Sequence, residues 1–397
     1  VVLMMIVLVV LPCLTISENN WIDEEGTEIT GIAAIRAKRA SLENASGSLT
    51  TEKIQSVIAN YQYAYSDPAN FVREDGTMAS WLNNAAFAKY IQPDNDIKFL
   101  IDMAFTPKGE SYDYYAMGSL KLSEAENFYT RRLEKVEEYL NMDYSYGNYS
   151  ESDKEYYMHK NENIKTPFYY GYNSGWNKLL GISNVSLMVI ALVVCITLAP
   201  VFSSEYQTGA DAILLSTRYG RNKLIAAKLA ASFMLTSAVY GLGILVMTTV
   251  TLLIYGGGGW NCSLQVLNFL APTDANLLQT YLYVLLAGYC MCLFMQGITL
   301  LLSAKMDSPF PVIICALVFY FVPSFLPYSR SSRMYNNILN LLPAKMAAAY
   351  AALTKYEVFH IPGLNIPYPV MLILTALIAA TITLPFAYKG FHKHQVA

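Results

Sequence analysis

The sequence contains few charged residues. Charged side chains make up 14% of the 397 residues and apolar side chains 54%, whereas soluble proteins average about 25% charged residues. Charge is missing altogether from several apolar runs that reach roughly 20 residues, the length a helix needs to cross the hydrocarbon core of a bilayer. This composition excludes an ordinary soluble globular protein and predicts a chain with several membrane-spanning helices.

Motifs that carry chemistry are also missing. The chain has no GxxxxGK[ST] phosphate loop, so it is not expected to hydrolyse ATP. It has no HExxH and no GxSxG, which argues against a zinc protease and a serine hydrolase. His159 has no second ligand at metal spacing. We therefore expect no catalytic residue, metal, cofactor or nucleic-acid partner.

Cysteine is absent from residues 18–178, so this region must fold around an ordinary core without disulfides. Five of the 6 cysteines in the chain lie in apolar runs, and Cys262 lies in a predicted loop without an obvious partner. Cys290 and Cys292 are two residues apart and point to different faces of a helix. They are expected to be small buried thiols and not metal ligands.

Six apolar runs are predicted to span the membrane. Their cores lack Asp, Glu, Lys and Arg, the residues that mark the ion path of coupled carriers, so energy for transport would have to come from a partner. We expect residues 1–17 to be a first span truncated at its N-terminus, because a basic n-region and a cleavage site typical of signal peptides are absent. The runs are Val1–Ile16, Gly181–Val201, Leu224–Tyr255, Gln279–Ala304, Pro309–Pro327 and Pro367–Tyr388.

Basic residues predict the orientation of these spans. The segment 203–223 and the start of the third run are rich in Lys and Arg, which marks the cytoplasmic side. Alternation then places residues 18–178 outside the cell and the tail 389–397 inside. The transmembrane domain is predicted over 181–388, in a multi-pass protein of the plasma membrane. The outer loop 328–366 carries four basic residues, a mild violation of the rule.

Residues 18–178 are long enough for one domain, and their pattern is mainly helical. Thr50 is expected to cap one helix, and a capping box beginning at Ser123 predicts another. A third helix is expected to contain Trp81. The Tyr-rich stretch 141–175 predicts loops or an amphipathic region near the membrane. Its acidic surface could bind a cationic peptide through Tyr faces, although solvation is the simpler explanation.

The most informative stretch is 202–228, the polar, basic-ended segment between the second and third runs. It contains an aromatic residue, a Glu, a Gly four residues on, a Leu pair, a small residue, an Arg, and a Lys that opens the third span. In this pattern the chain resembles the permease subunits of ABC-2-type transporters. It departs from the family where a Pro often follows the small residues, since Arg218 and Tyr219 stand there. The matching residues are Phe202, Glu205, Gly209, Leu214, Leu215, Ser216, Arg221 and Lys228.

The resemblance covers spans two to six and implies an all-α polytopic membrane protein of six transmembrane helices. The large, mainly helical extracellular domain would be inserted between the first and second spans. The resemblance includes the outer hairpin before the last span, which prolines interrupt. In this chain these prolines are Pro323, Pro327, Pro343 and Pro362.

The resemblance also implies partners and a function. A second permease subunit, identical or different, and separate ATPase subunits would complete a transporter that exports a peptide, a drug or a lipid-like compound. The segment 203–223 would hold the cytoplasmic coupling helix. The residues expected to couple the permease to the ATPase are Glu205, Gly209, Leu214, Leu215, Arg218, Arg221 and Lys228.

The residues themselves leave several readings of this segment open. Glu205 at the membrane edge is expected to pair with a nearby base or to cap the loop helix. Gly209 would allow close backbone approach. The apolar side chains 213–215 could dock into a groove of a partner, and the basic residues could meet acidic groups there or only contact lipid headgroups. Rival functions are a four-span permease that works by mechanical transmission, and a non-transporting sensor or anchor whose outer domain binds a ligand.

Overall fold

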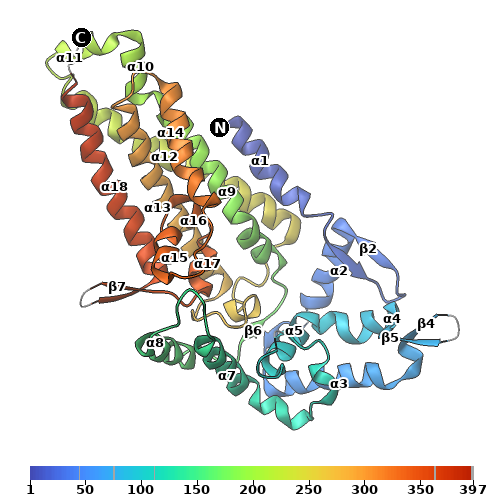
Figure 1. Ribbon diagram of the computed structural model, residues 1–397. Coiled ribbons are helices and arrows are strands. Elements are labelled where there is room, and N and C mark those ends of the chain that lie inside the picture. Colours follow the sequence, from blue (N-terminus) through green and yellow to red (C-terminus); the bar gives the residue numbers. More distant parts are fainter. Residues whose placement is uncertain (44, 75–76, 111, 362–363, 395–397) are drawn as a thin grey trace.

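The computed structural model describes residues 1–397 except 44, 75–76, 111, 362–363 and 395–397, and it consists of a helical bundle with a domain at one end (Figure 1). The long helices of the bundle follow the apolar runs, because uncharged runs of this length are most stable as helices in a bilayer. In the described part of the chain, four helices are long and apolar enough to cross a membrane, the first of them continuing to Thr208. They are α9 (Ser174–Leu198), α12 (Lys223–Tyr255), α13 (Leu277–Ser303) and α18 (Tyr368–His392).

Two further apolar helices are shorter. Helix α1 (Val2–Leu14) has 13 residues and α14 (Pro309–Phe325) has 17. Met4 and Leu8 of α1 are buried in the bundle core, where α1 packs on α9 and α12. A helix of 13 residues, such as α1, rises about 20 Å, which is less than the roughly 30 Å of the hydrocarbon core. Of the six predicted spans, four correspond to described helices that are long and apolar enough to cross a membrane. The count of six spans therefore remains a prediction.

Helix α13 packs more extensively than any other described helix of the bundle, chiefly on α9 and α18 and also on α12 and α14. Glycines allow the close approach. A Cβ added at Gly288 would lie 2.5 Å from Cδ2 of Leu187 on α9, and one added at Gly297 would lie 2.0 Å from Oγ1 of Thr383 on α18. Small residues serve this purpose in membrane bundles, where close packing replaces the hydrophobic effect.

The described residues between α1 and α9 form the domain at one end of the bundle and are mainly helical, whereas the predicted bounds 18–178 stay a prediction. Its core gathers apolar side chains from several helices, including Ile58, Leu100 and Phe128. Its longer helices are α2 (Gly31–Glu43), α3 (Thr51–Ser66), α5 (Asn95–Phe105), α7 (Phe128–Asn141) and α8 (Glu151–Glu162). Its shorter helical turns are η1 (Pro68–Asn70), α4 (Asn84–Ala86), η2 (Phe87–Ile91), η3 (Gln92–Asp94), α6 (Ala116–Ser119) and η4 (Leu122–Asn127).

The protein is not strictly all-α, because the described residues also form four two-stranded antiparallel sheets. Three of them belong to the domain and one precedes α18. Single hairpins of this size are marginal alone, so they depend on packing against the helices. The pairs are β1 (Asn20–Ile22) with β2 (Glu28–Thr30), β3 (Gly47–Ser48) with β6 (Tyr169–Tyr170), β4 (Phe71–Glu74) with β5 (Thr77–Leu82), and β7 (Val358–Ile361) with β8 (Leu364–Pro367).

Only some of the predicted helix starts in the domain are correct. Thr50 caps α3 by accepting a hydrogen bond from the Lys53 N–H. The box predicted at Ser123 is wrong, because residues 122–127 form a 3₁₀ segment in which Glu124 accepts from the N–H of Lys121. Trp81 lies in β5 and not in a helix. The stretch 141–175, predicted to be loops or an amphipathic region, contains the helix α8. A capping box at Ser150 begins this helix.

The segments 256–276 and 326–367 connect the bundle helices at the end that carries the domain (Figure 1). Helix α12 ends at Gly256, whose φ is 86°. Pro343 opens α16, Pro323 lies inside α14, and Pro362 is outside the described residues. The helices of the second segment are α15 (Arg333–Asn340), α16 (Pro343–Met346) and α17 (Tyr350–Thr354).

The second connecting segment docks on the Tyr-rich part of the domain through Arg333. Its Nη1 lies 3.1 Å from Oε1 of the mostly buried Glu357, and Nη2 donates to the Gly147 carbonyl oxygen at 2.8 Å. The guanidinium also stacks over the Tyr149 ring, 3.9 Å from its centroid. This basic residue, which breaks the predicted charge rule, therefore has a structural role between two parts of the chain.

Candidate functional site

The segment that carries the motif forms two short helices, α10 (Pro200–Thr208) and α11 (Ala210–Ser216). They lie at the end of the bundle opposite the domain, beside the C-terminal end of α18 (Figure 1). The chain passes from α9 into α10 through Ala199 without a loop. Gly209 separates α10 from α11 with a φ of 70°, a conformation that favours glycine. The space around its Cβ position is open, so the turn and not close approach requires this glycine.

Glu205 and Lys228 form an ion pair within the chain. The Lys228 ammonium donates to Oε1 of Glu205 and to the carbonyl oxygen of Val201. The side chains of Glu205 and Lys228 are 14% and 19% exposed. Lys228 also lies over the rings of Phe202 and Phe391, at 5.2 and 5.5 Å from their centroids. Of the roles expected for Glu205, the structure therefore shows pairing with a base, and that base lies in the second turn of α12.

Helix α10 is also attached to the end of α13. The Ser303 hydroxyl accepts from the N–H groups of Phe202 and Ser203 at 3.0 and 3.1 Å, and donates to the Ala199 carbonyl oxygen at 2.7 Å. The Tyr206 hydroxyl donates to the carbonyl oxygen of Ala304 at 3.1 Å. The motif did not point to Ser303, since a single serine at the end of an apolar run carries no signal of its own.

The apolar side chains of α11 divide between the bundle and the surface. Ile213 is 72% exposed, Leu214 is half-buried, and Leu215 is only 3% exposed within the bundle core. Leu215 therefore cannot serve in the docking patch that the sequence predicted, whereas Ile213 can. Arg218 is exposed beside the Tyr219 ring, which is 47% exposed. An exposed Ile and Tyr with an Arg between them are typical of a protein contact surface.

A comparison with known families agrees with this arrangement. The family model described as ABC-2 family transporter protein matches residues 1–394. The chain belongs to the ABC-2 transporter family. No curated protein and no solved structure matches it. The resemblance drawn from residues 202–228 is confirmed, and the chain is a membrane-embedded ABC permease, a transport subunit.

In this permease the predicted coupling residues do not form one cluster. Glu205 and Lys228 meet, and Gly209 forms the turn beside them. Arg221, in the turn after α11, lies beside the C-terminal end of α18. Its Nη1 donates to the carbonyl oxygen of His392 at 2.7 Å. Leu215 faces inward and Arg218 outward. The residues of the motif thus separate into those that hold the element on the bundle and those that face away from it.

Proposed function

We propose that this permease is one half of an exporter driven by a separate ATP-binding subunit, and that α11 and the following turn are its contact with that subunit. The observation that carries the proposal is the division of α11, with Leu215 anchored in the bundle and Ile213 exposed. The exposed surface lies at the end of the bundle, where a peripheral subunit could reach it without entering the membrane (Figure 1).

The anchors indicate how a displacement of α11 would spread. A push on α11 moves α10, which continues α9. The ion pair to Lys228 links α10 to α12, and the Ser303 hydroxyl links it to α13. Closure of the ATPase pair on ATP binding would therefore act on three bundle helices at once. Because packed helices shift between discrete arrangements, such a push could reshape a path between two permease subunits.

Copurification tests the proposed partner. The tagged full chain is isolated in mild detergent, and its companions are assayed for ATP hydrolysis and for a Walker motif in their sequences. We expect a stoichiometric ATP-hydrolysing subunit that Ile213→Glu weakens and that Leu364→Glu, on the exposed part of β8, leaves bound. Purification of a permease that transports substrate without any ATP-hydrolysing companion would overturn the proposal.

The proposed topology places residues 18–178 outside the cell and α11 in the cytoplasm. Single cysteines in place of Tyr114, 68% exposed, and Ile213, 72% exposed, are suitable probes. The exposed native Cys13 is first replaced by Ala. An impermeant maleimide should label position 114 in intact cells and position 213 only after permeabilisation. The reverse pattern would contradict the topology.

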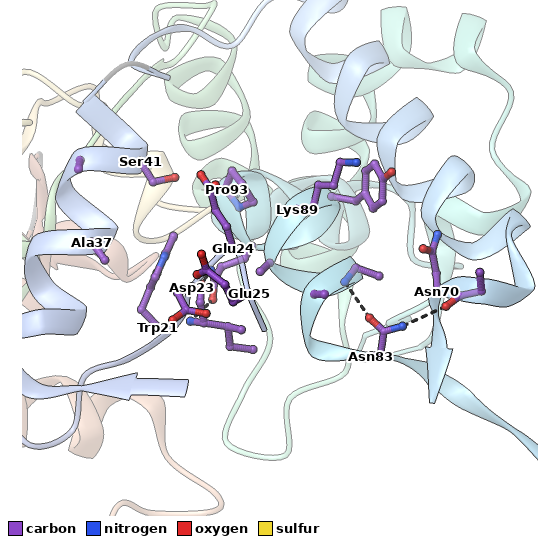
Figure 2. A pocket seen from close by; sticks show the side chains of 18 residues that line it. Trp21, Asp23, Glu24, Glu25, Ala37, Ser41, Asn70, Asn83, Lys89 and Pro93 are labelled. Carbon is purple, nitrogen blue, oxygen red and sulfur yellow. Dashed lines mark hydrogen bonds between the residues drawn. The ribbon is translucent and has the colours of Figure 1, made fainter. Parts of the chain in front are cut away.

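One observation favours ligand binding by the domain, as in the sensor alternative. A cavity of about 1130 Å³ lies between α2, the β1–β2 turn and the segment 84–93. Figure 2 shows the carboxylates of Asp23, Glu24 and Glu25 gathered at this turn, with Trp21 on one side of them and Lys89 on the other. The family assignment favours transport, and in a transporter the cavity could hold substrate. A domain ligand that binds without changing ATP hydrolysis by the complex would support the sensor role.

A further inference from the structure

The end of α18 is fastened to α11 and to the turn that follows it. Arg221 and His392 exchange two hydrogen bonds: Nη1 of Arg221 donates to the His392 carbonyl oxygen at 2.7 Å, and Nδ1 of His392 contacts the Arg221 carbonyl oxygen at 2.6 Å. Because a carbonyl oxygen only accepts, Nδ1 must carry the proton of this bond. The Arg221 guanidinium also reaches the carbonyl oxygen of His394 at 3.3 Å.

His394 makes the second attachment. Its Nε2 lies 3.3 Å from Oδ2 of Asp211, in the first turn of α11, and its ring packs on Tyr206 with centroids 4.1 Å apart. Asp211 is 6% exposed. A buried carboxylate without a partner would be strongly unfavourable, so the imidazole compensates for its burial. Asp211 also lies where the helix dipole favours a negative charge.

These contacts matter because α11 is too short to be stable alone. It has seven residues, whereas isolated helices below about 12 residues are marginal in water. Leu215 anchors its far end, and the contacts with residues 392–394 hold its first turn and the turn after it. A docking surface that is ordered in advance binds more tightly, because less conformational entropy is lost on binding.

We propose that His392 and His394 form a clasp that orders α11 for docking and makes α18 move with it. This inference rests on the proposed coupling function, which it deepens. It adds α18 to the helices that a push on α11 would reach, beside α9, α12 and α13. The two histidines are positioning residues, since they act through Asp211 and Arg221.

The clasp is tested first without any partner. Hydrogen exchange of the amides 210–222 is measured by mass spectrometry on the full chain in nanodiscs. The double variant His392→Ala/His394→Ala should exchange there roughly 5- to 30-fold faster than wild type, as expected for loss of one or two kcal/mol of local order. Lys393→Ala is the control, because its exposed side chain lies between the two histidines. His394→Gln, which keeps a donor near the Nε2 position, should stay close to wild type.

The coupling role is then tested with the ATP-hydrolysing subunit bound. The double variant should bind that subunit several-fold more weakly and lose substrate-stimulated ATP hydrolysis, while Lys393→Ala behaves as wild type. Unchanged exchange in the double variant would overturn the clasp itself. Faster exchange with normal binding and stimulation would overturn its role in coupling. A wild-type chain that binds no ATPase would instead refute the proposed function, and the exchange experiment would still decide whether the clasp exists.

Discussion

Arg132 provides the sharpest test of how the domain is attached to the bundle. It lies on α7 and is 2% exposed. Its Nε donates to the carbonyl oxygen of Phe269 at 2.8 Å, and its Nη2 donates to the carbonyl oxygen of Ala271 at 3.0 Å and to Oδ1 of Asn161 at 2.9 Å. The two carbonyls belong to the segment between α12 and α13. A buried cation thus joins the domain to that segment.

The magnitude follows from two opposing effects of replacing Arg132 by Met, which keeps most of the apolar stem. The Phe269 and Asn161 oxygens lose a charged donor, at about 1.5–3 kcal/mol each, whereas Ala271 keeps a bond from Gln265 at 3.1 Å. Burial lowers the pKa of Arg132 to about 10 from 12.5 because it disfavours the charged form. Removing that buried charge therefore stabilises the folded state by about 3 kcal/mol. The balance of the two effects is centred on a net local destabilisation of about 1.5 kcal/mol.

Hydrogen exchange on the full chain measures this effect in α7 and in residues 264–273. Arg132→Met should accelerate exchange in both segments by roughly 10-fold, the factor that corresponds to about 1.5 kcal/mol. The control is Arg131→Met, whose side chain is 47% exposed and pairs with Glu134 at 2.7 Å. Such a surface pair contributes less than about 1 kcal/mol. Equal exchange in the two variants, or acceleration in α7 alone, would refute the proposed attachment.

Three further predictions concern the bundle and its connecting segments. In a double-mutant cycle of Glu205→Ala and Lys228→Met, thermal unfolding should show a coupling energy of about 1–3 kcal/mol, as expected for two partners of one ion pair. Additive effects of the two substitutions would show that Glu205 acts elsewhere, for instance on the ATPase. Gly297→Ala places a Cβ 2.0 Å from Thr383 Oγ1 and should destabilise the bundle by about 1–3 kcal/mol, whereas Gly241→Ala, in open space on α12, should not; equal melting temperatures would contradict the packing. The pKa of His360 is raised by its bond to Asn365 and by Asp153, whose Oδ1 lies 3.1 Å from Nε2 of His360. The contribution of His360 to stability is therefore full below its ordinary pKa near 6.5 and is lost as the pH rises through the higher pKa of the folded state. Over that range hydrogen exchange should show a slight loosening of the contact of β7–β8 with α8, and His360→Gln should remove this pH dependence.

Local patterns predicted what depends on nearest neighbours along the chain. The lengths of the apolar runs predicted α12, α13 and α18 to within four residues at each end, because desolvation of the backbone in a bilayer favours helices there. Helix α9 begins seven residues before its predicted run. The motif located α10 and α11, and Gly209 is the turn residue between them. Where two similar capping signals occur, the sequence could not choose between them: the box at Ser150 forms, whereas the one at Ser123 gives way to a 3₁₀ segment.

Contacts between distant segments could not be predicted from the sequence. Glu205 was expected to find a base, but nothing in the local pattern selected Lys228 over Arg218 or Arg221. Helical periodicity places Ile213 and Leu215 on different faces without saying which face the bundle covers. Arg132 looks like one more charge on an amphipathic helix, because two of its three acceptors are backbone carbonyls more than 130 residues away in the sequence.

The central claim is that the exposed face of α11 binds an ATP-hydrolysing subunit. Site-specific photocrosslinking in the membrane tests it directly, with a photoreactive residue in place of Ile213 and, as a control, in place of Leu364, which is 63% exposed on β8. The account predicts that position 213 crosslinks to an ATP-binding protein with a Walker motif and that position 364 does not. A crosslink to that protein from position 364, or none from position 213 in a complex that copurifies intact, would contradict the account.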